Sequence, residues 1–548
     1  MADAAQAEAA RQAVMVALDW RSTPEARQAA TAYLESVKAG NVHTLAAVAY
    51  SLVKQEWSSE VRLYGFKMLQ HLIRLRWDEL SEEEHRQMAF MALNMIQEVA
   101  KPHEQWALKS QAAALVAEVS RRGGPPMWKE MLPNLFSLSA SSSIHSELVA
   151  MVLRWLPEDV TVHNEDLEGE RRRQLLFGLT QTLPETLPFL FQLLETHFTA
   201  VMTFTASKQE EVAKQHAAAV TATLNAVVAY AEWAPVTSMV ESRLIEACGI
   251  LQGAPQFRLN ACEVLKLIAA RRKPADDTAP LFTASMVRVL EVLLSASEAF
   301  LIHIGQQASA TMEAFGGAKS ASEEIDVEYG ECLCEAMVAL GSHNLHCIVE
   351  DETKLEAYLT RMLGFLQLRS LALHSQALPL WLTLLRDTAS SVVSKGDTPG
   401  PASSTENGFV APHVEKEKKG VALLITDELC AVLLDLGFRR LLVRGPELDE
   451  SEDFSTPVDY SQYRSRMLEL VRLVATIKPL VAVTKVAQQL EIVLNIVEPS
   501  NPSSQERLSL ETTQVMLETV IKGIPEAIME AEASSKRELG LKLEGITS

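Results

Sequence analysis

The chain has 548 residues, of which 48% are hydrophobic and 22% are charged, and its formal net charge at pH 7 is -21. This length exceeds the size at which a single compact core stops growing, so it predicts either several domains or an elongated repeat array. The strong acidity argues against indiscriminate binding to nucleic acid or to an anionic membrane surface, because such affinity comes from Lys and Arg that displace counterions. Any RNA contact must therefore be local.

Composition predicts a mostly α-helical intracellular protein. Only 22 Pro and 23 Gly interrupt the chain, and alternating strand-like runs are almost missing from it. The six cysteines form no even framework, which fits a reducing compartment. The N-terminus lacks the features of a signal or transit peptide, and the long apolar stretch 286–304 is interrupted by Arg288, Glu291 and Glu298. We therefore expect a soluble chain without membrane insertion.

Helix boundaries are well marked in the first 160 residues. Thr23 followed by Pro24 is a good helix start, Ser81 with Glu84 predicts a capping box, and the Gly and Pro residues of 123–126 predict a stop. Short loops predict antiparallel hairpins of about 40 residues, the length of a HEAT repeat. The predicted helices are 3–19, 23–39, 41–55, 59–76, 81–99, 103–122, 127–139 and 143–155.

One spacing recurs along the chain and indicates a repeat. A basic residue is followed by a small residue at +3 and by aliphatic residues at +7 and +10, which lie on one face of a helix. The small residue would let a neighbouring helix approach closely. The three matches are Arg62, Gly65, Leu69 and Leu72; Lys109, Ala112, Val116 and Val119; and Arg258, Ala261, Leu265 and Ile268. Together these patterns predict an all-α fold, a HEAT-repeat α-solenoid in which antiparallel hairpins form a right-handed superhelix.

Beyond residue 160 the helical character continues with less distinct boundaries. Residues 389–420 are rich in Ser, Pro, Gly and charge and predict a disordered insertion; 445–457 predicts an acidic loop, and 535–548 a polar tail. The repeats divide into 1–100, 101–270, 271–388 and 421–534. The predicted helices are 168–182, 185–204, 207–232, 236–251, 256–271, 281–314, 322–342, 351–387, 421–440, 457–496 and 505–534.

The sequence carries no catalytic signature. It contains no phosphate-binding loop, dinucleotide fingerprint, HExxH or GxSxG motif, so we expect no enzymatic activity. The residue types of one cluster suit zinc. Its first two cysteines are only two residues apart on a predicted helix and point in different directions, which favours buried thiols in helix packing over a metal site. The cluster comprises Cys332, Cys334, His343, His346 and Cys347.

Two groups of polar residues are candidates for binding. Basic clusters at helix ends fit either dipole complementation or anion binding, but Arg171, Arg172 and Arg173 open a helix and are the stronger candidate for RNA or another anionic cargo. On helix 59–76 the core stripe leaves a second, polar face, which is either an ordinary solvated surface or a binding surface. Its residues are Glu60, Tyr64, Lys67, His71 and Arg74, and transfer of the repeat by 47 positions adds Gln111, Glu118 and Arg121.

The order of several motifs resembles the karyopherin-β family of nuclear transport receptors. These motifs are EVRLYGFKMLQHLIRLRW from Glu60, WALKSQAAALVAEVSRRGGPPMWKEMLPNL from Trp106, LVAMVLRWLPEDV from Leu148 and GERRRQLLFGLTQTLPETLPFLFQLLE from Gly169. The last block is particularly similar to the exportin-five branch in its plant form. The resemblance is closest over 1–270. Members of the family run to roughly twice the length of this chain, so the resemblance implies that the chain corresponds to an N-terminal half.

This resemblance implies a nuclear export receptor that shuttles between nucleus and cytoplasm. It implies binding of the Ran GTPase in its GTP form through the N-terminal repeats, within 1–100, and of structured small RNA such as microRNA precursors, or of proteins, as cargo. Nuclear pore FG-repeat proteins would be further partners, and GTP would be present only through bound Ran, with no cofactor of the chain's own. Two alternatives remain: a generic HEAT-repeat scaffold without Ran dependence, and an RNA-binding module, which the acidic charge disfavours.

Overall fold

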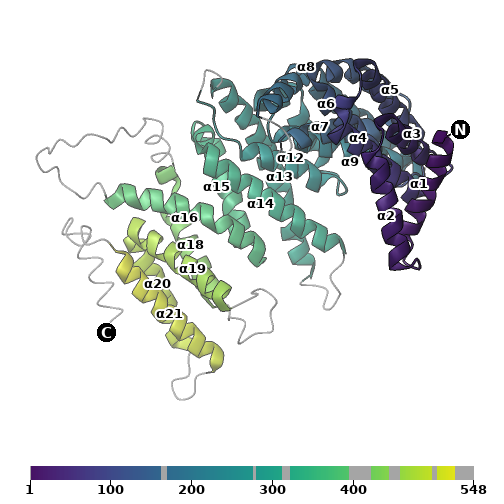
Figure 1. The fold of residues 1–548 in the computed structure, drawn as a ribbon. Helices are drawn as coiled ribbons and strands as arrows, with labels where there is room; N and C mark the ends of the chain where they lie inside the picture. Colours follow the sequence, from purple (N-terminus) through teal and green to yellow (C-terminus); the bar gives the residue numbers. More distant parts are fainter. Residues whose placement is uncertain are drawn as a thin grey trace, which may run out of the picture. The chain divides into compact units, whose positions relative to one another are not determined.

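All regular structure in the described part of the chain is helical (Figure 1). The computed structural model describes residues 2–161, 169–275, 279–311, 321–393, 421–442, 457–496 and 503–524. The chain forms two compact units, residues 1–268 (unit 1) and 269–548 (unit 2). The predicted range 1–100 and nearly all of the predicted range 101–270 lie together in unit 1.

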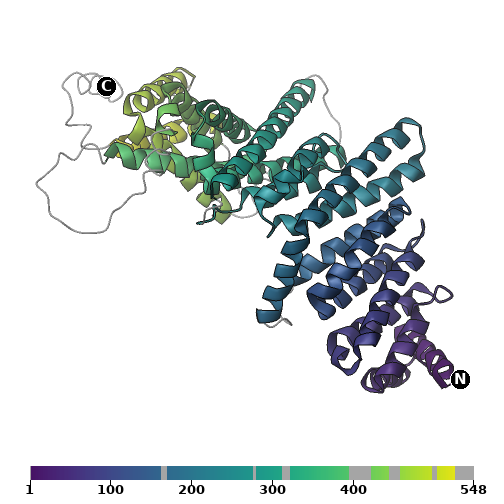
Figure 2. The ribbon, with the colours of Figure 1, turned by 90° about the horizontal axis from the view of Figure 1, so that it is seen from above.

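Unit 1 is a stack of helical hairpins (Figure 2). Its first helices have the predicted bounds to within three residues and the predicted caps: Thr23 accepts from the backbone of Ala26, and Ser81 with Glu84 forms the capping box. The elements are α1 (Ala2–Leu18), α2 (Pro24–Ala39), α3 (Val42–Val53), α4 (Ser59–Leu75), η1 (Trp77–Glu79), α5 (Glu82–Val99), α6 (Trp106–Ser139), α7 (Ser143–Thr161), α8 (Gly169–Ala206), α9 (Glu210–Ala231), α10 (Val236–Glu241), α11 (Leu244–Leu251) and α12 (Arg258–Ala269).

The apolar face of each repeat is buried as the spacing predicts. On α4, Val61, Met68, Leu69 and Leu72 are inaccessible to solvent or nearly so. A Cβ atom on Gly65 would lie 2.9 Å from the Cβ atom of Leu52, so the small residue of the repeat does permit close approach of α3. Second helices also pack on each other along the stack, α4 on α6 and α7 on α9. This is the predicted all-α solenoid of HEAT type, whereas its superhelical handedness stays a prediction.

Helix α6 breaks where the glycines and prolines predict a stop. Gly124 has φ 76, a left-handed conformation that glycine adopts without a Cβ clash, and Pro125 and Pro126 begin the second segment. The bend brings Pro125 against α8, where a Cβ atom on Gly178 would lie 2.7 Å from the Cβ atom of Pro125. The bend therefore fixes how α6 meets α8.

The prediction of two helices over 168–204 was wrong. Helix α8 runs without a break from Gly169 to Ala206 and contains Pro184 and Pro188. Each proline removes a backbone hydrogen bond from the helix. Leu183, Leu187 and the leucines that follow are buried, so tertiary packing outweighs the cost of the lost hydrogen bonds.

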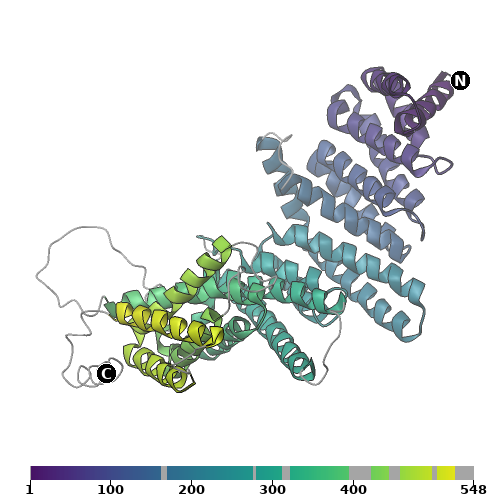
Figure 3. The ribbon, with the colours of Figure 1, turned by 90° about the horizontal axis from the view of Figure 1, so that it is seen from below.

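Unit 2 continues the hairpin arrangement (Figures 1 and 3). Helices α19, α20 and α21 pack on one another, and α14 packs on α13, α15 and α16. The elements are α13 (Ala279–Thr311), α14 (Ala321–Val349), α15 (Glu352–Gln367), α16 (Leu371–Val393), α18 (Asp427–Leu441), α19 (Pro457–Ile477), α20 (Pro479–Ile496) and α21 (Ser504–Gly523).

Three predicted long helices are pairs of shorter ones. Range 236–251 divides at Arg243, which adopts φ 63, 351–387 divides after Gln367, and 457–496 divides before Pro479. A proline cannot donate the hydrogen bond of a helix interior, which accounts for the last break. The predicted insertion at 389–420 begins inside α16, and its residues 394–420 lie outside the described part. The acidic loop up to residue 456 and the polar tail 535–548 lie outside it as well.

Candidate functional site

The polar face of α4 is a surface of mixed charge. Glu60 and Lys67 are exposed, whereas Tyr64 and His71 are half-buried. Since α4 buries its apolar stripe against α3, the 3.6-residue period turns these four side chains away from the core. Arg74 extends the face by one turn and is also exposed. The predicted residues of α4 therefore do form one surface.

Helix α2 adds two residues to this face that the sequence analysis did not select. The Nζ atom of Lys38 lies 5.4 Å from the centre of the Tyr64 ring and 2.7 Å from Oε1 of Glu35. Burial lowers the pKa of His71, and the positive charge of Lys38 lowers it further, so His71 is a neutral imidazole near pH 7. The Glu35–Lys38 spacing of three residues on a predicted helix was the available signal.

The end of α4 is tied to the end of α2. Arg76 donates through Nη1 to the carbonyl oxygens of Lys38 (2.9 Å) and Gly40 (2.6 Å) and binds Glu79 through its other nitrogens. These carbonyls carry the partial negative charge of the α2 C-terminus. Arg76 thus holds the two second helices of neighbouring hairpins in fixed register beneath the face.

Gln111 and Glu118 of α6 lie beside α4. Gln111 accepts a hydrogen bond from Gln70 (3.0 Å), and Glu118 accepts one from Arg74 (3.1 Å). Their hydrogen-bond partners are thus residues of α4 other than Tyr64 and His71, the residues at equal positions in the repeat. The Glu118 side chain is only 1% exposed, and its ion pair holds the Arg74 side chain from the buried side.

The three consecutive arginines of α8 do not gather in one place. Successive helical residues project about 100° apart. Arg171 turns inward and donates to the carbonyl oxygen of Arg122 (2.6 Å), while Arg173 is exposed and pairs with Glu170 (3.0 Å). Arg172 also has an interaction partner. The side chains of these three arginines therefore lie in at least two different environments.

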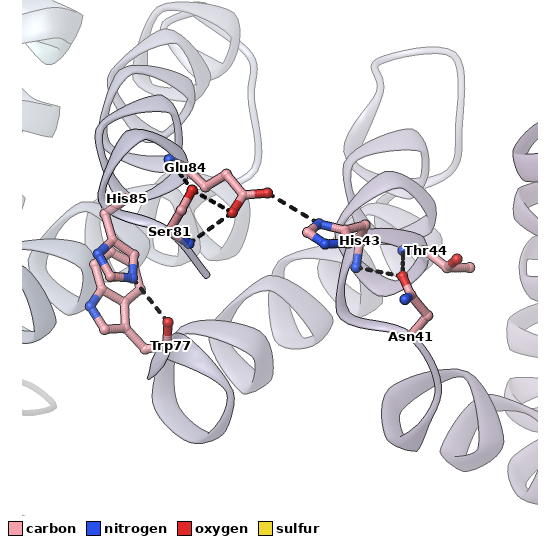
Figure 4. Close-up of polar contacts among 7 residues, drawn as sticks. All are labelled: Asn41, His43, Thr44, Trp77, Ser81, Glu84 and His85. Atoms are coloured by element: carbon pink, nitrogen blue, oxygen red, sulfur yellow. Dashed lines mark hydrogen bonds and ion pairs between the residues drawn. The ribbon is translucent and has the colours of Figure 1, made fainter. Parts of the chain in front are cut away.

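A second polar group connects the starts of α3 and α5 (Figure 4). Asn41 caps α3 by accepting from the backbone of His43 and Thr44, and Glu84 closes the capping box of α5. His43 Nδ1 lies 3.2 Å from the free oxygen of Glu84, and the backbone hydrogen bond from Ser81 keeps the pKa of Glu84 low. These contacts join two first helices at an exposed edge and offer no catalytic arrangement.

The cysteines have packing roles. All six are free and buried, and burial raises the pKa of Cys334 to about 12, so it remains a thiol. Within the described residues no three His, Cys, Asp or Glu side chains come together as metal ligands. One stretch, Val327–Val349 of α14, is long and apolar enough by composition to cross a membrane, but 56% of its most apolar window is buried in unit 2.

Comparison with known proteins matches both parts of the chain to nuclear export receptors. Residues 324–547 match the Exportin-5 family, and residues 105–265 match Exportin 1-like protein. The chain is 40% identical to Protein HASTY 1 of Arabidopsis thaliana over 93% of its own length and 42% of that protein. It is 21% identical to Exportin-5 of Dictyostelium discoideum over 96% of the chain and 44% of that protein. The chain thus spans somewhat less than half the length of these relatives.

Solved structures give a more distant likeness. Kap121p bound to RanGTP is 12% identical, with a TM-score of 0.41, over 98% of this chain and 52% of that one. Kap121p bound to Nup53p is 11% identical, with a TM-score of 0.42, over 98% of this chain and 53% of that one.

Proposed function

Because the chain belongs to the exportin-5 family, we propose that it acts as a nuclear transport receptor that binds Ran in its GTP form and carries cargo out of the nucleus. The observation that carries this proposal is the 40% identity to Protein HASTY 1, which extends over 93% of the chain. The chain spans 42% of the length of that relative.

Ran-GTP binds, in this proposal, to the polar face of α4. Glu60, Tyr64 and Lys67 are accessible there and lie on a rigid helix, the placement that suits a specific protein contact. Arg74 extends the same surface, with His71 and Lys38 beside Tyr64. Gln111, next to Gln70, continues it onto α6, whereas the enclosed Glu118 acts by holding Arg74.

Cargo is the second part of the proposal: structured small RNA, such as microRNA precursors, or proteins. A net charge of -21 repels a polyanion at long range, so RNA contact requires local basic residues. The exposed Arg173, together with Arg172 on the same turn of α8, is the proposed contact, whereas Arg171 is directed inward. Helices contact duplex RNA through its phosphates and shape rather than its bases, so sequence preference would be weak.

No chemical step by the chain is needed. Ran-GTP and cargo would each favour the same arrangement of repeats, so each raises the affinity of the other by linkage. Hydrolysis of GTP on Ran would then release both in the cytoplasm, and nuclear pore FG-repeat proteins would be the partners during passage. The chain would therefore shuttle between nucleus and cytoplasm without a cofactor of its own.

A single pull-down tests the proposal. The chain is immobilised and incubated with Ran loaded with GTP or with GDP, each with and without a hairpin RNA. We expect retention of Ran-GTP but not of Ran-GDP, and more Ran-GTP when cargo is present. Equal retention of the two nucleotide forms would instead support a HEAT-repeat scaffold without Ran dependence.

A further inference from the structure

Three arginines of α4 and α6 surround one buried carboxylate in unit 1, and a fourth, from α8, lies beside one of them. The carboxylate of Glu118 lies 3.1 Å from Nε of Arg74, 2.6 Å from Nη2 of Arg121 and 3.6 Å from Nε of Arg122. Arg171 of α8 joins them by donating to the carbonyl oxygen of Arg122 at 2.6 Å. We call Arg74, Arg121, Arg122 and Arg171 the arginine cluster.

Among the described residues, the cluster holds more positive charge than its partners balance. Its four guanidinium groups have there the single charge of Glu118 and about half a charge from the end of the first α6 segment. Arg121 is 3% exposed, and among the described residues the Nε atoms of Arg121 and Arg122 are buried without a hydrogen-bond acceptor. Burial lowers the pKa of Arg122, and the charge of Arg121 lowers it further. Buried charges of this kind are costly unless an anion pairs with them.

We propose that the arginine cluster binds the phosphate group of a phosphorylated serine or threonine on a partner protein. A phosphomonoester carries about 1.5 to 2 negative charges, close to the surplus of the cluster, and the planar guanidinium fork matches its oxygens. Each phosphate of an RNA backbone carries one charge, and RNA affinity comes from many such contacts in a row. Arg173, the proposed RNA contact on α8, lies outside the cluster and pairs with Glu170.

Access is available from the α4 side. The Arg74 side chain is 47% exposed, and Arg122 is partly accessible, whereas Arg121 and Glu118 form the floor. In the proposal, a phosphate on a protruding side chain contacts the exposed Arg74 and the partly accessible Arg122, and Arg121 adds its positive charge from the buried side. Glu118 organises the guanidinium groups but competes with the ligand for them. The site shares Arg74 with the polar face proposed for Ran-GTP, whereas Arg121, Arg122 and Arg171 lie outside that face, so phosphate binding is measured in the absence of Ran.

The test measures the affinity of the whole chain for a short alanine-glycine peptide that contains one phosphoserine, by isothermal titration calorimetry. The same peptide without phosphate and an RNA hairpin with a 5′ hydroxyl are the comparison probes. The variants are Arg74→Gln and Arg171→Gln within the cluster and Arg173→Gln as the matched control outside it. Arg74 is half-exposed, so its replacement keeps the fold even if the Arg171 variant loosens α8.

We expect the phosphopeptide to bind and the two comparison probes not to bind. The affinity of Arg74→Gln for the phosphopeptide should be about tenfold weaker than that of wild type, and the affinity of Arg173→Gln should be unchanged. Glu118→Gln should bind the phosphopeptide more tightly than wild type, which a purely structural role of this carboxylate does not predict. Equal binding of the two peptides, or equal affinity of the Arg74 and Arg173 variants, would overturn the proposal. An RNA hairpin that depends on the same arginines and displaces the phosphopeptide would assign the site to nucleic acid instead.

Discussion

Lys109 on α6 and Glu147 on α7 form an ion pair inside the hairpin stack. Their Nζ and Oε2 atoms are 2.8 Å apart, and each side chain is 9% exposed. Arg62, the residue at the equivalent repeat position on α4, pairs in the same way with Glu104 at 2.9 Å. In these two copies the basic residue that opens the repeat is therefore neither a surface charge nor a ligand contact. Arg62 connects α4 to the loop before α6, and Lys109 connects α6 to α7.

Loss of one partner should destabilise unit 1 strongly. Lys109→Ala leaves the buried carboxylate of Glu147 unpaired, and we expect the free energy of unfolding to fall by about 3–5 kcal/mol. Lys109→Met with Glu147→Leu removes both charges and should recover most of it. Urea unfolding followed by tryptophan fluorescence measures this, since seven of the eight tryptophans lie in residues 1–268. The control is Lys214→Ala, whose pair with Glu211 is exposed to solvent and therefore contributes little to stability. Similar losses for both single variants would contradict this account.

A methyl group at the small position of the repeat should also destabilise the stack. In Gly65→Ala the new Cβ atom would lie 2.9 Å from Cβ of Leu52 and from Cγ2 of Val53, so the α3–α4 contact must open. We expect a net loss of about 1–2 kcal/mol, because overpacking exceeds the gain in helix propensity. Gly169→Ala, where no atom lies within 4 Å of the new Cβ, should change the same urea midpoint little. A stabilised Gly65 variant would refute the close-approach argument.

Sequence reasoning worked best where the signal was local. The capping pair Ser81–Glu84 and the stop at Gly124 each depend on residues a few positions apart, and the structure confirms both. The core stripe of α4 followed from its period alone. It failed for α8, where Pro184 predicts a break that buried leucines override, and for Arg243, whose left-handed conformation has no sequence signal.

The candidate site was predictable only in part. Side chains on one helix, such as Tyr64 and Lys67, follow from periodicity, but the offset between α4 and α6 does not. That offset places Glu118 under Arg74 and removes it from the surface. The contact of Arg171 with Arg122, 49 positions away, depends instead on how the bend at Gly124 meets α8. Distances between helices are tertiary quantities, and one sequence carries no direct record of them.

Replacement of Tyr64, Lys67 and His71 together by alanine should weaken Ran-GTP binding by at least about tenfold without unfolding the chain. The three side chains lie off the buried stripe, so the core stays intact. The matched control is a triple alanine variant of Glu83, Arg86 and Gln87, which are exposed on α5. Affinity is measured by calorimetry with Ran loaded with GTP. Unchanged binding by a folded Tyr64 variant would move the proposed Ran site away from α4.

The stability of unit 1 should fall in mild acid because of two facing histidines. His197 on α8 and His216 on α9 place their Nδ1 atoms 2.8 Å apart, so one ring donates and the other accepts. Burial, together with the neighbouring His216, lowers the pKa of His197 from 6.5 to about 4, and burial also lowers the pKa of His216. A base whose pKa is lower in the folded state binds protons preferentially when unfolded. Its contribution is therefore complete above about pH 6.5 and is lost progressively as the pH falls toward 4.

Between pH 7 and pH 5 we expect the free energy of unfolding to fall by about 1–2 kcal/mol through His197, read from urea unfolding with tryptophan fluorescence. His197→Gln keeps a hydrogen-bonding group opposite His216 but does not titrate, so it should remove most of this pH dependence. His374→Gln is the matched control, because His374 is a buried histidine of unit 2 whose pKa is also lowered to about 4. Since seven of the eight tryptophans report on unit 1, that variant should leave the measured pH dependence nearly unchanged. A pH dependence equal in wild type and His197→Gln would show that the proton uptake on unfolding occurs at other groups.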